Sequence, residues 1–380
     1  MDENLDSDQQ VLLDASSRFM EKTYPLVSVR EGDFDEATPA RAYWHQAAEL
    51  GWFSLLVPEE LGGGNVSGNG VIDAALVAYR RGQLLQPGPF VGTNLVAYAL
   101  ATGGSDEQQE KVLPALICGA ARGAWAITGI SGSPAMDGVA IGSATHNGYR
   151  LSGSATFVED PGPGGWILIG METDEGPSQA LLSADELGTR IVRLDSLDLS
   201  RRFVELRLDG VEVPASAVVG PAGSAANPVQ QQLAIACTLS VAESVGAMDR
   251  EFSMTVEYAK NRIAFGRPIG SFQAIKHVLA DTSLYLEMSK AIAMVAANYL
   301  GSGDGYGRAA ASMAKAFVGD CGIDLAQNCF QVFGGIGFTW EHDQHLYLRR
   351  LTTDAACYGS PPWHREHLCQ LSEFEELGAP

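Results

Sequence analysis

The sequence lacks the features that mark several large protein classes. Its six cysteines form no CxxC pair, and no stretch approaches the roughly 18 to 20 consecutive apolar residues of a membrane span. The first ten residues, MDENLDSDQQ, are acidic where a secretion signal would be basic. We therefore expect reduced thiols rather than a disulfide framework, no membrane insertion and a cytoplasmic location.

Positive charge is also scarce. The chain has 25 Lys and Arg against 46 Asp and Glu, which gives a formal net charge of −21 and a sequence pI near 4.6. Nucleic acids and anionic membranes would repel such a chain, so we expect neither as a partner. A length of 380 residues with 46% hydrophobic residues exceeds one ordinary core and predicts two or three domains.

The hydrophobic pattern divides the chain into three parts. Residues 1–121 show helical periodicity, as in VIDAALVAYRRGQLL, and predict an N-terminal helical domain. Residues 122–225 change to short β-type runs such as WILIGM, with a hairpin around Asn147-Gly148. Long helical patterns return in residues 226–380. We expect an α+β multidomain fold with a middle β-barrel or β-sandwich domain and a C-terminal four-helix bundle.

One acidic residue is unusual within these helices. Glu243 is the only charged residue between Gln230 and Met248, among alanines, serines and a glycine that let neighbouring elements approach closely. In dry surroundings its pKa would rise, as in a general base. It is equally open that Glu243 faces a backbone donor, an arginine or water. Arg262 and Arg267 further along could grip a phosphate, or only complement the helix dipole.

The stretch QVFGGIGFTWEHDQHLYLRR combines glycines, aromatics and two histidines. Its glycines follow a predicted helix rather than a strand, so they do not form a dinucleotide-binding fingerprint. The pairs His342 with His345 and His364 with His367 have no cysteine at ligand spacing, and we expect no metal site. Glycines after a helix do allow backbone N–H groups to approach a phosphate or a ring.

Several motifs together resemble a known family. NRIAFGRPIGSFQAIKHVLAD and QVFGGIGFTWEHDQHLYLRR are similar to the C-terminal half of the acyl-CoA dehydrogenases, and GWFSLLVPEELGGG resembles their N-terminal helical domain. The resemblance covers essentially the whole chain. It implies α,β-dehydrogenation of an acyl-CoA substrate, FAD held between subunits that assemble as dimers of dimers, and an electron-transfer acceptor.

The resemblance also implies FAD contacts in two places. In the bundle, the positions matched to contacts with a neighbouring subunit's FAD are Arg262, Phe265, Gln273, Gln331, Gly334 and Gly335. In the β-domain, the positions matched to the flavin and acyl-CoA site are Ala126, Thr128, Ser133, Phe157 and Val158. The segment Phe157-Val158-Glu159 stands where the family has Trp-Ile-Thr against the isoalloxazine ring. An aromatic ring is kept there, but the hydroxyl is absent.

The catalytic base departs from the family pattern. Tyr358, in AACYGSPPWHR, stands where most members carry the Glu that removes the α-proton, and the other known location aligns with Ala236. Glu243 lies nearly two helical turns beyond Ala236, and Asp354 lies one turn before Tyr358. These two carboxylates are the candidate catalytic residues.

Some motifs point to one branch of the family. FGRPIGSFQAIKH and YGSPPWHREHL resemble actinobacterial members that act on steroid-derived CoA thioesters, many of which pair two unlike subunits. We expect an FAD-dependent dehydrogenase subunit for a fatty or sterol-derived acyl-CoA, in a homo- or heterotetramer with a related subunit. Two alternatives stay open. One is a non-catalytic partner that completes the FAD site of a related chain. The other is a flavin oxidase or monooxygenase, which Glu159 near the flavin edge would favour.

Overall fold

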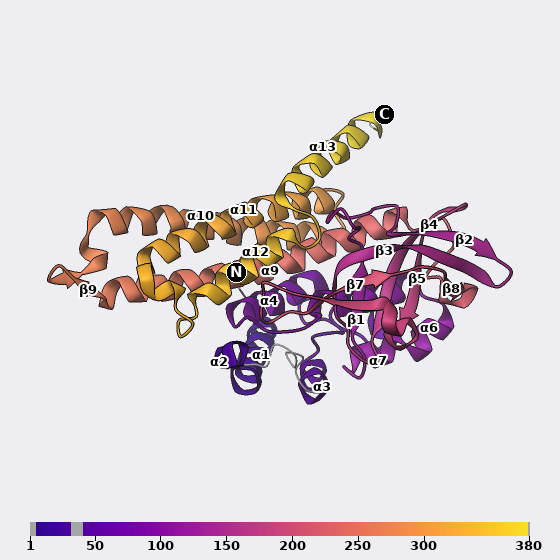
Figure 1. The fold of residues 1–380 in the computed structure, drawn as a ribbon, viewed down its shortest axis with the longest axis horizontal. Helices are drawn as coiled ribbons and strands as arrows, with labels where there is room; N and C mark the ends of the chain where they lie inside the picture. The colour runs from indigo at the N-terminus through magenta and orange to yellow at the C-terminus, as the bar shows by residue number, and fades with distance from the viewer. Residues whose placement is uncertain (1–4, 32–40, 379–380) are drawn as a thin grey trace.

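The computed structural model describes residues 5–31 and 41–378 of the protein. Within these ranges the chain forms N-terminal helices, a middle β-sheet and long C-terminal helices, which confirms the predicted α+β fold class (Figure 1). No helix in the described ranges is long and apolar enough to cross a bilayer.

The N-terminal helices begin at side chains that cap them. Asp6 caps α1 and Ser105 caps α6, each in a capping box with the glutamine three residues later, and Asn69 caps α4. The elements of this part are α1 (Ser7–Thr23), α2 (Leu26–Glu31), α3 (Arg41–Glu49), η1 (Glu59–Leu61), α4 (Gly70–Gln83), α5 (Phe90–Gly103), α6 (Asp106–Lys111) and α7 (Leu113–Ile117).

The middle part is an eight-stranded mixed sheet in the order β1-β4-β2-β3-β7-β6, in which β5 also pairs with β4 and β8 with β3. The predicted hairpin is confirmed, because Thr145 pairs with Gly148 across the β2–β3 turn. The strands are β1 (Gly123–Ala126), β2 (Ala140–Thr145), β3 (Gly148–Glu159), β4 (Trp166–Thr173), β5 (Gly176–Ser183), β6 (Ile191–Leu194), β7 (Phe203–Arg207) and β8 (Val211–Pro214). Short helices α8 (Ala184–Leu187), η2 (Gly188–Arg190) and η3 (Ala215–Ala217) connect them.

The C-terminal part is built on three long helices, α9 (Ala226–Asn261), α10 (Gln273–Gly301) and α11 (Gly307–Phe333). A small hairpin of β9 (Ile263–Ala264) and β10 (Arg267–Pro268) and the turn η4 (Ile269–Ser271) join the first two. After α11 come η5 (Gly334–Phe338), α12 (Gln344–Ala356) and α13 (Pro361–Gly378). The sequence pattern did not separate α12 from the glycine-rich stretch before it.

Two glycines allow α4 to lie directly on α9. A Cβ atom at Gly82 would sit 1.8 Å from the carbonyl oxygen of Glu243, and one at Gly246 would sit 1.9 Å from that of Tyr79. The small residues around Glu243 therefore permit the close approach that the sequence predicted. One hydrophobic core joins the N-terminal helices to the bundle, and a second core lies within the sheet.

Candidate functional site

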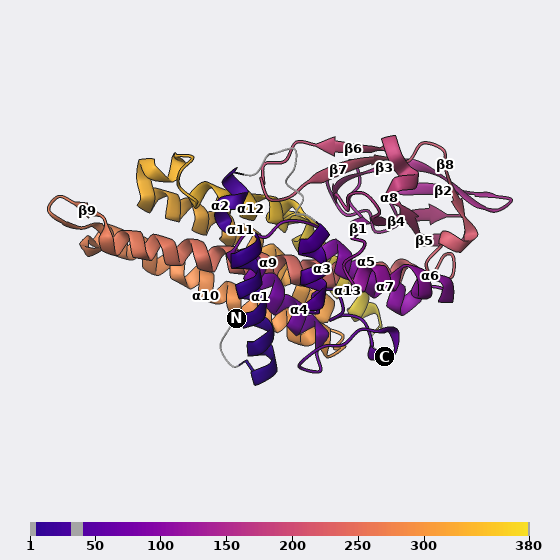
Figure 2. The same cartoon turned by 90° about the horizontal axis from the view of Figure 1, so that it is seen from below.

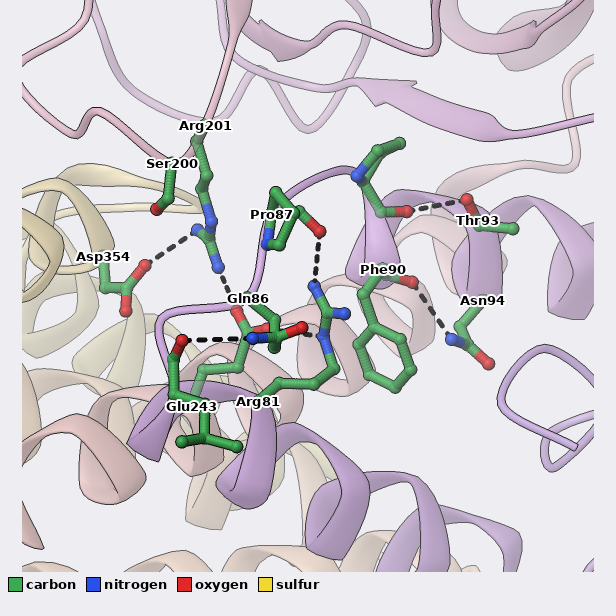
Figure 3. A network of polar contacts seen from close by, with 12 residues as sticks. Arg81, Gln86, Pro87, Phe90, Thr93, Asn94, Ser200, Arg201, Glu243 and Asp354 are labelled. Atoms are coloured by element: carbon green, nitrogen blue, oxygen red, sulfur yellow. Dashed lines mark hydrogen bonds and ion pairs between the residues drawn. The ribbon is translucent and has the colours of Figure 1, made fainter. Parts of the chain in front are cut away.

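A cluster of buried charged side chains joins the three parts of the chain, and Figure 3 shows most of it. Arg201, in the loop between β6 and β7, donates from Nη1 to Oδ1 of Asp354 at 2.8 Å and from Nη2 to Oε2 of Glu243. Arg81 of α4 donates from Nε to Oε1 of Glu243 at 3.1 Å. With Glu159 at the end of β3, these residues form what we call the Arg201 cluster. Each member is less than a tenth exposed.

The pKa values of the two candidate bases move in opposite directions. Burial alone would raise the pKa of Glu243, but the charges of Arg201 and Arg81 outweigh it and hold that pKa below its ordinary value. The expectation of a raised pKa at Glu243 is therefore wrong, and the open alternative of a facing arginine is what the structure shows. Burial raises the pKa of Asp354, and the charge of Arg201 offsets only part of this rise. Asp354 also accepts a hydrogen bond from Ser244 at 3.2 Å.

A second buried ion pair holds the loop that carries Arg201. Arg350 of α12 donates to Asp198 and to the hydroxyl of Ser200, and also to the carbonyl of Gln86 at 3.0 Å. Burial opposes ionisation of Asp198, yet Arg350 and Arg201 hold the pKa of its carboxyl below the ordinary value. Sequence reasoning missed Arg81, Asp198 and Arg350. For Arg350 the available signal was an arginine among the helically spaced apolar residues of LYLRRL, and this signal is weak on its own.

The five β-domain residues matched to the flavin and acyl-CoA site lie around the same junction. Ala126 ends β1 and is buried, and Thr128 is a buried residue that bridges to Pro134. Ser133 is half-buried in the loop after it, where its carbonyl accepts from Gly129. The remaining pair is Phe157 and Val158 on β3. Phe157 is 50% exposed with φ of +52°, whereas Val158 is buried.

Tyr358 lies beside this group, after the end of α12. Its ring stacks on Trp125 of β1 at 6.4 Å between centroids, and its φ is +56°. Two contacts fix the end of α12 and the residues after it. His364 contacts the carbonyl oxygen of Tyr358 at 2.9 Å, and Lys315 donates to the carbonyl of Asp354 at 2.7 Å. Burial, and then the nearby Glu159 charge, raise the pKa of Tyr358 well above its ordinary value, so the phenol is neutral.

The bundle residues matched to FAD contacts lie at the far end of α9 (Figure 1). Arg262 caps α9 and is exposed, and Phe265 in the β9–β10 turn is 95% exposed with φ of +51°. The other four residues begin α10 or end α11 and continue into η5, and all are exposed or half-buried: Gln273, Gln331, Gly334 and Gly335. A side chain built on either glycine would meet nothing within 4 Å, so their backbone is open to a ligand.

The two matched sets do not come together within one chain. Figure 2 shows the β9 hairpin at one end of the molecule and the sheet at the other. Glu243, which contacts the sheet through Arg201, and Arg262 are separated along α9 by about 29 Å at 1.5 Å of rise per residue. The two matched sets therefore lie in separate parts of the molecule.

The histidine pairs are used in packing. The His342 ring lies 4.4 Å from that of Phe333, and the His345 ring stacks on Trp340 at 5.2 Å. His367 stacks on Trp363 at 4.8 Å. In the part of the chain that the structure describes, no group of three or more His, Cys, Asp and Glu side chains could hold a metal ion.

Helices, then a mixed sheet, then a bundle of long helices give the chain the three-part fold of the acyl-CoA dehydrogenases. The chain belongs to the acyl-CoA dehydrogenase family. Residues 6–120 match the N-terminal domain of that family, and residues 227–369 match its C-terminal domain. The acyl-CoA dehydrogenase IpdE2 of Mycobacterium tuberculosis is 30% identical over 359 residues, which is 93% of this chain and 94% of the relative.

Solved structures share the whole fold. A chain of the ChsE4–ChsE5 complex of Mycobacterium tuberculosis superposes with a TM-score of 0.84 at 26% identity, and the match covers 100% of this chain and 100% of that chain. Glutaryl-coenzyme A dehydrogenase bound to glutaryl-CoA superposes with a TM-score of 0.85 over 98% of this chain and 97% of that chain. At 23% identity the second likeness shows the fold alone.

Proposed function

We propose that the chain is a subunit of an FAD-dependent acyl-CoA dehydrogenase that acts on a fatty or sterol-derived acyl-CoA, in a tetramer with a related subunit. The carrying observation is that the sheet and the β9 hairpin, which carry members of the two matched residue sets, lie at opposite ends of the molecule, because one FAD contacted by both sets would then need a second chain. The likeness to the ChsE4–ChsE5 complex, which contains two named chains, supports a heteromeric assembly. The substrate class rests on the FGRPIGSFQAIKH and YGSPPWHREHL motifs.

The chemistry of the bundle end suits the ADP portion of FAD. Arg262 offers a guanidinium for the pyrophosphate, and the open backbone at Gly334 and Gly335 allows close approach of N–H groups. Phe265 presents a nearly fully exposed ring on which an adenine can stack. At the sheet, half-exposed Phe157 offers an aromatic surface to the isoalloxazine. When bound, FAD would accept the hydride that leaves the β-carbon of the thioester.

The Arg201 cluster limits which carboxyl group of this chain can act as a base. Glu243 and Asp354 are this chain's candidate bases, yet both are bound by Arg201, and a carboxylate held by a guanidinium is a weak proton acceptor. We therefore favour an assembly in which this chain also completes the FAD site of the related subunit, and in which neither Glu243 nor Asp354 acts as the base while Arg201 binds it. An electron-transfer acceptor then reoxidises the flavin.

A flavin oxidase or monooxygenase is the second candidate, and Glu159 favours it. This carboxyl group stands where the family has a threonine hydroxyl against the flavin, so the ring environment of this chain differs. Reoxidation of the reduced flavin distinguishes the two. Oxidation by air faster than by an artificial acceptor would support oxidase chemistry, and the reverse order would support the dehydrogenase.

The test is FAD content in the chain purified alone and co-expressed with a related subunit. We expect flavin absorbance in the assembly, bleaching by an acyl-CoA, and loss of FAD in Arg262→Ala. Removing one or two charge-assisted hydrogen bonds of ~1.5 to 3 kcal/mol each lowers FAD affinity at least about tenfold. Arg365→Ala, an exposed bundle arginine paired with Asp320, is the control. Unchanged FAD affinity in Arg262→Ala would refute the assigned contact.

A further inference from the structure

A bulge in β3 lies directly before a buried acid, Glu159. The pairing of β3 with β7 shifts register between Ala155 and Val158, and Phe157 between them has a left-handed backbone. Pairing is regular again at Val158 and Glu159, so their side chains point to opposite faces of the strand. Val158 shares the sheet core with Ala155, and Glu159 is buried on the other face, where it is only 7% exposed. This second face directs an acidic side chain toward the Arg201 cluster.

Glu159 is the acid of the Arg201 cluster that lacks a hydrogen bond from Arg201. The two terminal nitrogens of the guanidinium serve Asp354 and Glu243. The third nitrogen, Nε, lies 3.7 Å from Oε1 of Glu159, which is beyond hydrogen-bond length. Within the described residues, neither that Nε nor that Oε1 has a hydrogen-bond partner. Glu159 is therefore free to change its protonation without breaking a hydrogen bond at this oxygen.

The groups that face Glu159 come from every neighbouring element. They are Arg81 of α4, Arg201 of the β6–β7 loop, Glu243 of α9, Arg350 of α12, and Cys357 and Tyr358 after α12. Burial raises the pKa of Glu159 to about 7, since Arg201 only partly offsets it and Glu243 adds to the rise. Burial raises the pKa of Cys357 to about 12, and Tyr358 is neutral as well.

We propose that Glu159, and not Glu243 or Asp354, is the carboxyl group of this chain that exchanges a proton at the junction of the sheet and the bundle. The next step rests on the proposed function. Because Glu159 is the last residue of the segment matched to the flavin-ring contact, its carboxylate is the acceptor that this chain would offer for the α-proton of a bound thioester. With FAD bound as the hydride acceptor, Glu159 would take the proton from the breaking Cα–H bond, and the Cα=Cβ bond would form as the β-carbon loses its hydride.

Proton exchange is tested on the full chain without cofactor. We would label glutamate side chains with ¹³C at the carboxyl carbon and titrate the wild type, Glu159→Gln and Glu172→Gln by NMR. Glu172 lies on β4 of the same sheet and is the control. We expect one resonance to titrate near pH 7 and to vanish in Glu159→Gln alone. Persistence of that resonance in Glu159→Gln, or no carboxyl titrating near pH 7 in the wild type, would overturn the proposal.

A second variant protects the test against misfolding. Glu159→Asp keeps a carboxyl group but carries no glutamate label, so the same resonance must vanish while the fold is retained. In the assembled enzyme, FAD content is measured first, because absence of FAD would contradict the proposed function and leave the NMR result unaffected. With FAD bound, Glu159→Gln should slow bleaching at least about 100-fold and Glu159→Asp should restore part of it. Unchanged bleaching in Glu159→Gln would overturn the role as α-proton acceptor.

Discussion

Arg201 is the residue on which the junction of the three parts depends, so Arg201→Met is the most informative perturbation. Methionine fills similar space but removes the guanidinium that binds Asp354 and Glu243. Glu243 would keep Arg81, whereas Asp354 would keep only the Ser244 hydroxyl among these side-chain partners. Removing one partner of a buried ion pair typically costs ~3 to 5 kcal/mol, because the other charge is left buried and unpaired.

The loss should also depend on pH. Without Arg201 the folded-state pKa values of Asp354 and Glu243 rise. A group with a raised folded pKa contributes stability that is complete below its unfolded pKa and is lost as the pH rises through the folded pKa. The deficit of Arg201→Met should therefore be larger at pH 8 than at pH 5.5. Against a typical free energy of unfolding of ~5 to 15 kcal/mol, it is large enough to measure.

The assay is urea unfolding followed by tryptophan fluorescence at both pH values. The control is Arg207→Met on β7, which removes the same guanidinium from an exposed pair with Glu205 and should cost less than about 1 kcal/mol. A deficit for Arg201→Met below about 1 kcal/mol at pH 8, or one that grows toward pH 5.5, would refute the assignment of Arg201 as the tie between sheet and bundle.

Further perturbations test other parts of the same junction. Because Arg81 and Arg201 bind Glu243, Glu243→Gln should still allow bleaching by acyl-CoA, and loss of bleaching with FAD still bound would show that Glu243 is the base after all. Tyr358→Glu places a carboxylate at the family's usual base position and should accelerate bleaching by ~10² or more if a base is what this chain lacks; no acceleration contradicts this. Because the folded-state pKa of Glu159 is raised from 4.5 to about 7, the wild type should lose up to ~3 kcal/mol of stability as the pH rises through this range, and Glu159→Gln should not show this loss. Urea unfolding at pH 5 and 8.5 measures it, and an equal loss in wild type and variant disproves the burial argument. Gly82→Ala should cost ~1 to 3 kcal/mol by forcing α4 off α9, and wild-type stability would show that the contact relaxes freely.

Much of the site could be located from the sequence but not interpreted. The isolation of Glu243 among small residues correctly indicated burial in a close helix contact. Its partners could not be seen, because Arg81 and Arg201 lie 162 and 42 residues away in the chain. A carboxylate in dry surroundings has a raised pKa when alone and a lowered one beside two guanidinium groups, so the sign depended on residues that spacing does not reveal.

Glu159 was noticed only as a departure from a family motif. A strand pattern predicts alternation, and an acidic residue next to a buried valine would be read as exposed. Glu159 is buried instead, because its face of the strand is covered by residues from distant segments, which the local pattern does not reveal. The six bundle residues matched to FAD contacts were easier to place, because they lie near helix ends that glycines mark in the sequence.

The amino-acid sequence alone determined the order of the three parts and most of their elements, α12 excepted, because helical and strand periodicities arise from side chains within a few residues of one another. It also determined which family the chain resembles. Only the tertiary structure decided which charges meet, since Arg81, Glu159, Arg201, Glu243 and Asp354 come from five separate segments. The electrostatic character of each carboxyl group follows from that meeting, because in a buried site the nearest charges dominate over the intrinsic chemistry of the residue.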